Sequence, residues 1–166
     1  MLQPDNRWAK INIHVGAAKG DRVKALDTWC RNFERLPDNV KCRLTVENDD
    51  KANLYSIQHL YDGVFKRTGV AIVADQHHHE HGPQDLPWSE ALPLAASTWG
   101  GVRPTCHLSN SRTIEEPGVH ANAHSDWYYT PFIDFGLEVD VVLEAKMKER
   151  ALFKYQADFV NIRAAA

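Results

Sequence analysis

The feature that most constrains the fold is a series of five short apolar runs, each of which carries residues of the kinds that bind metals. The runs cover residues 10–15, 43–50, 70–79, 105–109 and 139–146, and in that order they carry His14, Glu47, Asp75 with His78, His107, and Glu144. Parallel α/β sheets collect their ligands at the carboxyl ends of the strands. Carboxylate oxygens and imidazole nitrogens bind divalent cations. The pattern therefore predicts parallel strands with a metal site at one end of the sheet.

Helical periodicity separates most of these runs. Apolar residues recur at spacings of three and four over residues 21–36, 52–65 and 147–160, and more weakly over 86–96. Alternating strands and helices are typical of an α/β fold with a parallel sheet. A chain of 166 residues can bury a real core, and we expect residues 1–166 to form a single domain.

The composition limits the classes of function. No apolar stretch approaches the roughly 18–20 residues of a membrane span, and the first residues show no signal-peptide pattern. Three cysteines at wide spacing do not suggest a disulfide framework, so a cytoplasmic location is expected. The net charge of −3 argues mildly against nucleic acid. Two or three bound divalent ions would reverse the local charge of three carboxylate ligands, so the argument is weak.

Two of the runs give the strongest local signals. Asp75 and His78 leave an almost wholly apolar strand three residues apart, so both can turn towards one ion, although a plain polar loop is the alternative. We expect the neighbouring His77, His79 and His81 to stay in solvent or to contact a ligand. Glu47 is the candidate for a carboxylate that bridges two metals.

Other residues have competing interpretations. Asp49 or Asp50 is expected to cap the next helix, as aspartate often does. His14 and His107 could each be an ordinary core histidine, and they gain weight as ligands because other strands end in the same way. Glu144 ends a buried run and needs a cation nearby, which is either a metal or a basic side chain, Lys146 or Arg43.

A long loop over residues 110–135 adds further candidates. His124 could complete a metal sphere, and His120 is the next choice. Arg112, Trp127 and Tyr128 would suit a phosphate contact and base stacking, although simple loop packing explains the aromatic residues equally well.

Taken together, these segments resemble the DNA UV-damage endonucleases, a branch of the TIM-barrel metal endonucleases. The matching stretches are I-H-V-G at 13–16, R-L-T-V-E-N-D-D at 43–50, V-A-D-Q-H-H-H at 73–79, C-H-L-S at 106–109, H-S-D at 124–126 and L-E-A-K-M-K-E at 143–149. The resemblance implies nicking of damaged double-stranded DNA 5′ of UV photoproducts or abasic sites. It also implies two or three divalent ions, with manganese favoured. The implied metal ligands are His14, Glu47, Asp75, His78, His107, His124 and Glu144, and among them Glu47, Asp75 and Glu144 are the candidate catalytic carboxylates.

The resemblance covers the C-terminal part of the family's barrel. About five βα units are visible here, whereas a closed barrel has eight strands, so a partial TIM-type barrel is expected. An open parallel sheet exposes an edge that favours pairing with another chain. Self-association is therefore expected if the chain is a naturally short form, and a fragment is the alternative. A non-catalytic metal- or DNA-binding remnant and a sugar isomerase-like barrel enzyme stay open as other functions.

Overall fold

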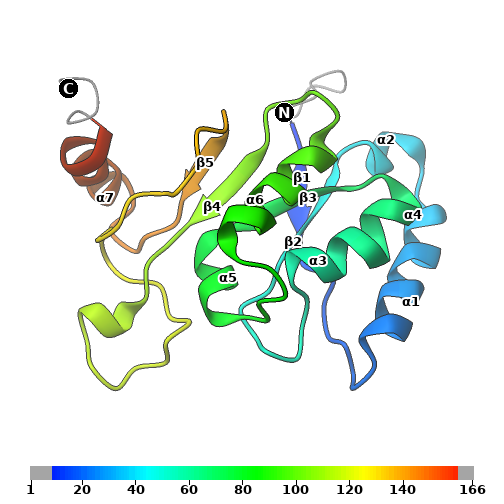
Figure 1. Cartoon of the computed structure of the whole chain (residues 1–166), viewed down its shortest axis with the longest axis horizontal. Helices are drawn as coiled ribbons and strands as arrows, with labels where there is room; N and C mark the ends of the chain where they lie inside the picture. The colour runs from blue at the N-terminus through cyan, green and yellow to red at the C-terminus, as the bar shows by residue number, and fades with distance from the viewer. Residues whose placement is uncertain (1–8, 161–166) are drawn as a thin grey trace.

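The protein is built on a five-stranded parallel sheet that curls into half of a barrel. The computed structural model describes residues 9–160. The strands are β1 (Ile11–Ile13), β2 (Leu44–Glu47), β3 (Ala71–Asp75), β4 (Thr105–Leu108) and β5 (Asp140–Leu143). They lie in the order β1-β2-β3-β4-β5, and every neighbouring pair is parallel (Figure 1). The prediction of about five βα units in a partial barrel is confirmed. The single-domain prediction covers residues 1–166, and the first eight and last six of these lie outside the described residues. The N-terminal segment in which no signal peptide was expected lies outside them as well.

Helices fill the connections between the strands. The α-helices are α1 (Arg22–Glu34), α2 (Asp38–Lys41), α3 (Ile57–Leu60), α4 (Lys66–Thr68), α5 (Gln76–His81), α6 (Trp88–Ala96) and α7 (Lys148–Tyr155). A π-helical segment, η1 (Tyr61–Phe65), joins α3 to α4, and η4 (Gln156–Val160) continues α7. Short 3-10 turns are η2 (Ser97–Trp99) and η3 (Arg112–Ile114). None of the helices within residues 9–160 is long and apolar enough to span a membrane.

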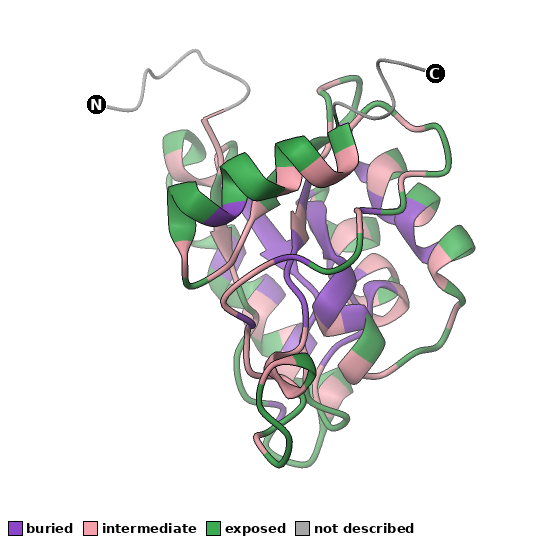
Figure 2. Cartoon of the chain, turned by 90° about the vertical axis from the view of Figure 1, so that its left-hand side faces the viewer, coloured by how far each residue is buried: buried purple, intermediate pink, exposed green. Residues whose placement is uncertain are grey.

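The two faces of the sheet have different chemical environments. Side chains alternate along a strand, so Val46, Ile72 and Leu108 face the helices and are almost wholly buried in the main hydrophobic core. Purple, the colour of buried residues, gathers at the middle of the molecule in Figure 2. Glu47 and Asp75 occupy the opposite, concave face at the ends of their strands. The sheet thus separates a dry core on its convex side from polar chemistry on its concave side.

Helix α1 was predicted well by its periodicity. Asp21 caps it, because its side chain accepts a hydrogen bond from the backbone N–H of Lys24. Leu26, Cys30 and Phe33 point into the core as expected, but Val23, expected on the same stripe, is 79% exposed. All three cysteines, Cys30 among them, are free thiols.

Two helix boundaries differ from the prediction. The helix expected over residues 52–65 begins at Ile57, because Ser56 and His59 form a reciprocal capping box there. It ends at Thr68, where Gly69 adopts a left-handed conformation. The cap predicted for Asp49 or Asp50 is therefore wrong. The loop expected over residues 76–87 begins instead with α5, whose N-cap is Asp75.

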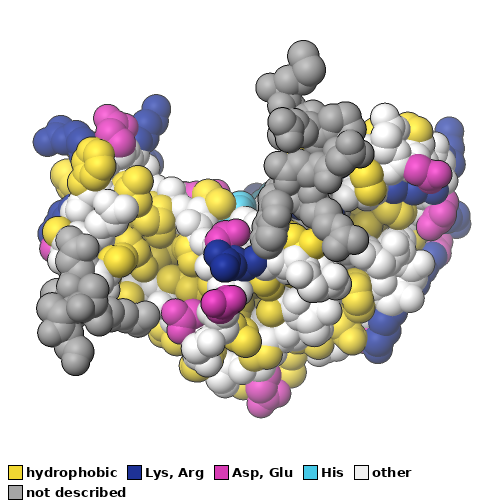
Figure 3. Space-filling model, turned by 90° about the horizontal axis from the view of Figure 1, so that it is seen from above, with side chains coloured by type: hydrophobic (Ala, Val, Ile, Leu, Met, Phe, Trp, Pro, Cys, Tyr) yellow, Lys and Arg dark blue, Asp and Glu magenta, His cyan; other side chains and the backbone are white. Residues whose placement is uncertain are grey.

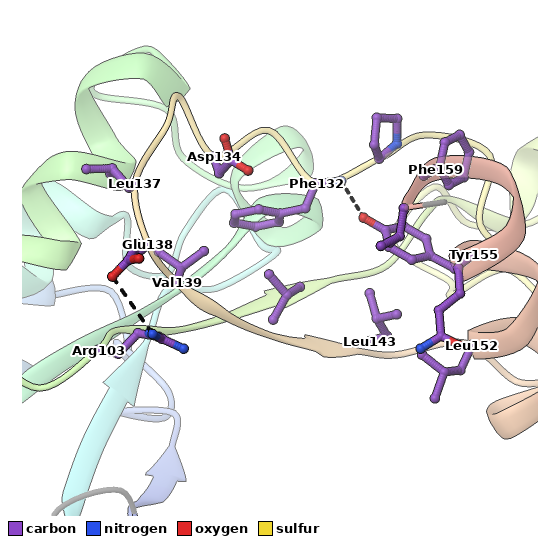
Figure 4. Close-up of a pocket in the computed structure, with 14 residues that line it drawn as sticks. Arg103, Phe132, Asp134, Leu137, Glu138, Val139, Leu143, Leu152, Tyr155 and Phe159 are labelled. Carbon is purple, nitrogen blue, oxygen red and sulfur yellow. Dashed lines mark hydrogen bonds and ion pairs between the residues drawn. The ribbon is translucent and has the colours of Figure 1, made fainter. Parts of the chain in front are cut away.

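An apolar pocket opens between β5 and α7. Phe132, Val141, Leu143, Tyr155 and Phe159 are among its lining residues, and the Tyr155 hydroxyl accepts a hydrogen bond from the Phe132 N–H at 3.0 Å (Figure 4). Viewed from above, hydrophobic side chains gather along the hollow on this side of the molecule (Figure 3). None of the predicted metal ligands lines this pocket.

Candidate metal centre

Glu47, the last residue of β2, lies at the middle of the candidate centre. Its side chain is nearly buried, with Oε1 3.0 Å from Nδ1 of His78 and Oε2 3.3 Å from Nδ1 of His107. Burial alone would raise the pKa of Glu47, but hydrogen bonds from His107 and His78 outweigh it and hold that pKa far below its usual range. Glu47 is therefore a charged carboxylate enclosed by imidazoles.

His14 follows β1 and approaches the same carboxylate. Its Nε2 lies 4.0 Å from Glu47, and its Nδ1 lies 3.0 Å from Oδ1 of Asp49. The hydrogen bond to Asp49 is the main reason that the pKa of His14 is raised. Asp49 is buried and its Oδ2 has no partner. Sequence reasoning assigned Asp49 to helix capping and so missed its place beside the centre.

Asp75 ends β3 in a fully buried position. Its Oδ1 accepts a hydrogen bond from the backbone N–H of His78 at 2.7 Å, which caps α5 and turns His78 towards Glu47. Its Oδ2 has no hydrogen-bond partner. Burial raises the pKa of Asp75. Because burying a carboxylate oxygen without a partner is costly, this oxygen is suited to bind a cation.

His107 and Glu144 complete the row along the strand ends. His107 lies on β4, where Cys106 points to the opposite face and into the core, because side chains alternate along a strand. Nδ1 of His107 lies 3.2 Å from Glu144, which directly follows β5. The structure places imidazoles beside Glu144, a partner that the sequence did not suggest, because Nδ1 of His124 also approaches it at 3.7 Å.

The loop that carries His124 is closed on itself by backbone contacts. His124 forms a bridge with Ser111, and Ser125 donates its N–H to the carbonyl of Asn110. His124 thus reaches the edge of the centre, whereas its alternative, His120, is exposed and makes no contact with the centre among the described residues.

The predicted ligands therefore converge at one end of the sheet. Ligand atoms of His14, Glu47 and His78 lie within 4.8 Å of one another, and so do those of Glu47, Asp75 and His107. Glu47 belongs to both groups. Because the donors are carboxylate oxygens and imidazole nitrogens, and because Asp75 offers an unused buried oxygen, these residues fit divalent cations.

Two asparagines support this centre, and sequence reasoning missed both. Asn12 donates from its side-chain amide to Oε2 of Glu47 and accepts from the Thr45 hydroxyl. Asn48 binds both backbone groups of Asp75, accepting from its N–H at 2.9 Å and donating to its carbonyl at 3.0 Å. A signal existed for Asn12, since it lies two residues before His14 and so shares its face of the strand.

The other histidines of α5 depart from expectation. His77 and His79 were expected in solvent or against a ligand, but they are 0% and 6% exposed. His79 packs beside Trp88. Burial lowers the pKa of His77 to about 4, so its ring is neutral.

The candidate DNA-binding residues lie in a self-supporting loop. Arg112 forms ion pairs with Glu116 and Asp126, each at 3.0 Å. Trp127 keeps some exposure and lies under the guanidinium of Arg150. Tyr128 is buried in the core, and the exposed ring of the run is that of its neighbour, Tyr129.

Comparisons with known proteins identify the family of this chain. The sequence model of the UV-endonuclease UvdE family matches residues 1–165. UV DNA damage endonucleases from Bacillus pumilus and Bacillus cereus (strain G9842) are 34% and 31% identical, over 92% of this chain and 49% of each relative. The crystal structure of SacUVDE superimposes with a TM-score of 0.81 at 30% identity, covering 93% of this chain and 52% of that chain. The chain thus spans about half the length of the curated relatives it matches, and it belongs to the UV-endonuclease UvdE family.

Proposed function

We propose that this chain carries the metal-binding part of a DNA-repair endonuclease that nicks damaged double-stranded DNA 5′ of UV photoproducts or abasic sites. The observation that carries the proposal is the position of Glu47, which contributes to two ligand groups at once. A carboxylate shared by two ions is the arrangement that two-metal phosphodiester chemistry requires. Family membership supplies the class of substrate.

The ligands divide by position. His14 and His78 would hold one ion with Glu47, while Asp75 and His107 would hold a second with the same carboxylate. Glu144 and His124 lie at the edge of the second group and would complete it or hold a third ion. When bound, two or three divalent ions, with manganese as the proposed metal, would supply positive charge against the phosphate.

The chain's own residues prepare this site. Asn12 and Asn48 hold Glu47 and the backbone of Asp75 in place. Such outer partners fix the orientation of ligands before a metal binds. Glu47, Asp75 and Glu144 are the proposed catalytic carboxylates, since they place negative charge where the ions are needed.

We propose that the loop over residues 110–135 contacts the DNA. Arg112 would reach a phosphate by exchanging one of its carboxylate partners, and Trp127 would offer part of its ring to a base. The predicted contact of Tyr128 requires the loop to open, because that ring is buried. Tyr129, 40% exposed, is the ring of this run that a base reaches without movement.

Self-association stays a prediction. Among the described residues β1 pairs only with β2 and β5 only with β4, so each has one unpaired edge. Because unpaired edges favour strand addition, we expect a second copy to cover them in solution. Light scattering on the purified chain measures this directly, and a monomer at all concentrations contradicts it.

A nicking assay tests the proposed function. The chain is incubated with Mn²⁺ and a duplex carrying one pyrimidine dimer, beside an undamaged duplex and a sample with a chelator. We expect cleavage 5′ of the dimer that is lost in Glu47→Gln and kept in Glu34→Gln, a matched change of an exposed carboxylate on α1. If folded chain binds Mn²⁺ without nicking, the endonuclease proposal fails for this chain, and the non-catalytic alternative takes its place.

A further inference from the structure

Helix α5 carries a second cluster of metal-ligand residues, separate from the centre around Glu47. His77, Glu80 and His81 each offer one ligand atom, and these three atoms lie within 4.8 Å of one another. Residues three and four apart share one face of a helix. His78, by contrast, points to Glu47 with its Nδ1 at 3.0 Å (α5 is labelled in Figure 1). The same short helix therefore presents ligands in two directions.

His77 is arranged as metal-binding histidines are. Its side chain is 0% exposed, and its Nε2 lies 3.2 Å from the carbonyl oxygen of Asn122. Because a carbonyl only accepts hydrogen bonds, Nε2 carries the hydrogen and Nδ1 keeps its lone pair. That Nδ1 is buried and has no partner. Histidines that bind metals typically donate their other ring N–H to a backbone carbonyl or carboxylate.

The other two residues complete the cluster from the surface side. The Nε2 of His81 is also buried without a partner, and the two imidazole rings lie 4.5 Å apart, edge to face. Glu80 is exposed, and one of its carboxylate oxygens accepts a hydrogen bond from the side chain of Gln76 at 3.1 Å. The two buried imidazole nitrogens and the carboxylate of Glu80 would thus serve as ligands for a metal. The exposed carboxylate also leaves the metal a path of entry from solvent.

We propose that His77, Glu80 and His81 bind one Zn²⁺ ion, independently of the centre around Glu47. Two nitrogen ligands and one carboxylate oxygen suit zinc, which would leave a fourth position for water. The ion would act on the loop rather than on the DNA. It would hold the His77 ring, whose other nitrogen binds Asn122, and Asn122 in turn donates to both the backbone and the side chain of Asp50.

The test is zinc stoichiometry on the full chain, with Zn²⁺ titrated against a coloured chelator. His81→Gln removes a partly exposed ligand, and Glu80→Gln keeps the shape of its side chain while removing the charge. The matched control is His120→Gln, on an exposed loop. We expect both α5 variants to lose one equivalent of tightly bound Zn²⁺ and to keep Mn²⁺ binding at the other centre, while the control keeps everything.

His14→Gln provides the reciprocal measurement, because His14 lies in the other centre. It should weaken Mn²⁺ binding and leave the α5 equivalent of Zn²⁺ intact. Far-UV circular dichroism verifies that each variant is folded. Equal zinc stoichiometry in wild type, His81→Gln and Glu80→Gln overturns the proposal, and so does loss of all zinc in folded His14→Gln, because one site would then account for both metals.

Discussion

Gly82→Ala tests whether α5 is held against the end of β2 as tightly as the structure has it. Gly82 follows α5, and a Cβ built on it would lie 2.0 Å from the carbonyl oxygen of Asp49 and 2.7 Å from that of His78. Both obstacles are backbone atoms. Ordinary contact begins at 3.4 Å, so the chain must move apart by about 1.4 Å, the difference between 3.4 and 2.0 Å.

The cost of this movement is estimated from overpacking. Forcing extra atoms into packed structure costs about 1–3 kcal/mol. Because both obstacles are backbone atoms, the cost lies in the upper part of this range, about 2–3 kcal/mol. The backbone of Gly82 (φ −92°, ψ −161°) is open to alanine, so a gain of up to about 1 kcal/mol from the unfolded chain offsets part of that cost. The net destabilisation is then about 1–2 kcal/mol, which lowers Tm by about 2–8 °C in a protein of this size.

The same movement reaches the metal centre. Asp49 binds His14, and the helix that would be displaced carries His78, 3.0 Å from Glu47. Binding sites lose function when their ligands shift by more than about 0.5 Å. We therefore expect the affinity for Mn²⁺ to fall by about 10- to 100-fold.

Gly63→Ala is the matched control. A Cβ there would lie 2.5 Å from Cδ1 of Leu26, the end of a side chain, and Gly63 lies within the helical segment η1. Alanine gains about 0.5–1 kcal/mol over glycine inside a helix, which offsets a change of rotamer at Leu26. Differential scanning calorimetry and Mn²⁺ titration of both variants give the answer. Unchanged Tm and unchanged affinity in Gly82→Ala refute the close approach of α5 to Asp49.

Three further predictions use the metal-free chain. Burial lowers the pKa of His78, but the hydrogen bond to Glu47 and the charge of Asp75 outweigh it and raise that pKa to about 9. The stabilisation that protonated His78 gives the fold is therefore complete below pH 6.5 and is lost as pH rises through about 9. Tm should fall across that window, and a flat profile contradicts the ion pair. Asp75→Asn keeps the cap on α5 and removes a buried carboxylate whose pKa is raised by burial. The Tm of the metal-free chain should therefore rise, while the affinity for Mn²⁺ falls by about 100-fold or more. A drop in Tm speaks against this account. Tyr155→Phe removes the acceptor for the Phe132 N–H and should cost about 1 kcal/mol in urea unfolding, with Mn²⁺ affinity unchanged; no loss of stability would mean that water replaces the hydroxyl.

The five strands were predictable because each reads as a short run with a ligand residue at or beside its end: Glu47 and Asp75 end β2 and β3, and the others carry one within a residue of theirs. Their order along the chain is also their order in the sheet, as short parallel connections favour. Helix α1 was predictable because its apolar stripe spans more than three turns. These are local, periodic signals that one sequence displays in full.

What escaped prediction depends on contacts between distant segments. Helix α5 has no apolar stripe, and it forms because Asp75 caps it and the buried His77 and His79 hold it to the fold. The partnership of Asp49 with His14 joins residues 35 positions apart. The conformation of the long loop rests on Asn110, whose side chain accepts hydrogen bonds from the N–H groups of residues 129 and 130. Such pairings leave no periodic pattern in the sequence from which they could be predicted.

The charges around Glu47 explain how this centre stays folded without metal. For His78 and His107 burial alone would lower the pKa, yet the hydrogen bonds to Glu47 and the nearby carboxylates raise it. Protonated imidazoles therefore supply positive charge beside the carboxylates that the metals would otherwise neutralise. An imidazole binds a metal only in its neutral form, so each ion has to displace these protons. The same contacts that stabilise the metal-free chain thus compete with metal binding, and the competition weakens as pH rises towards 9.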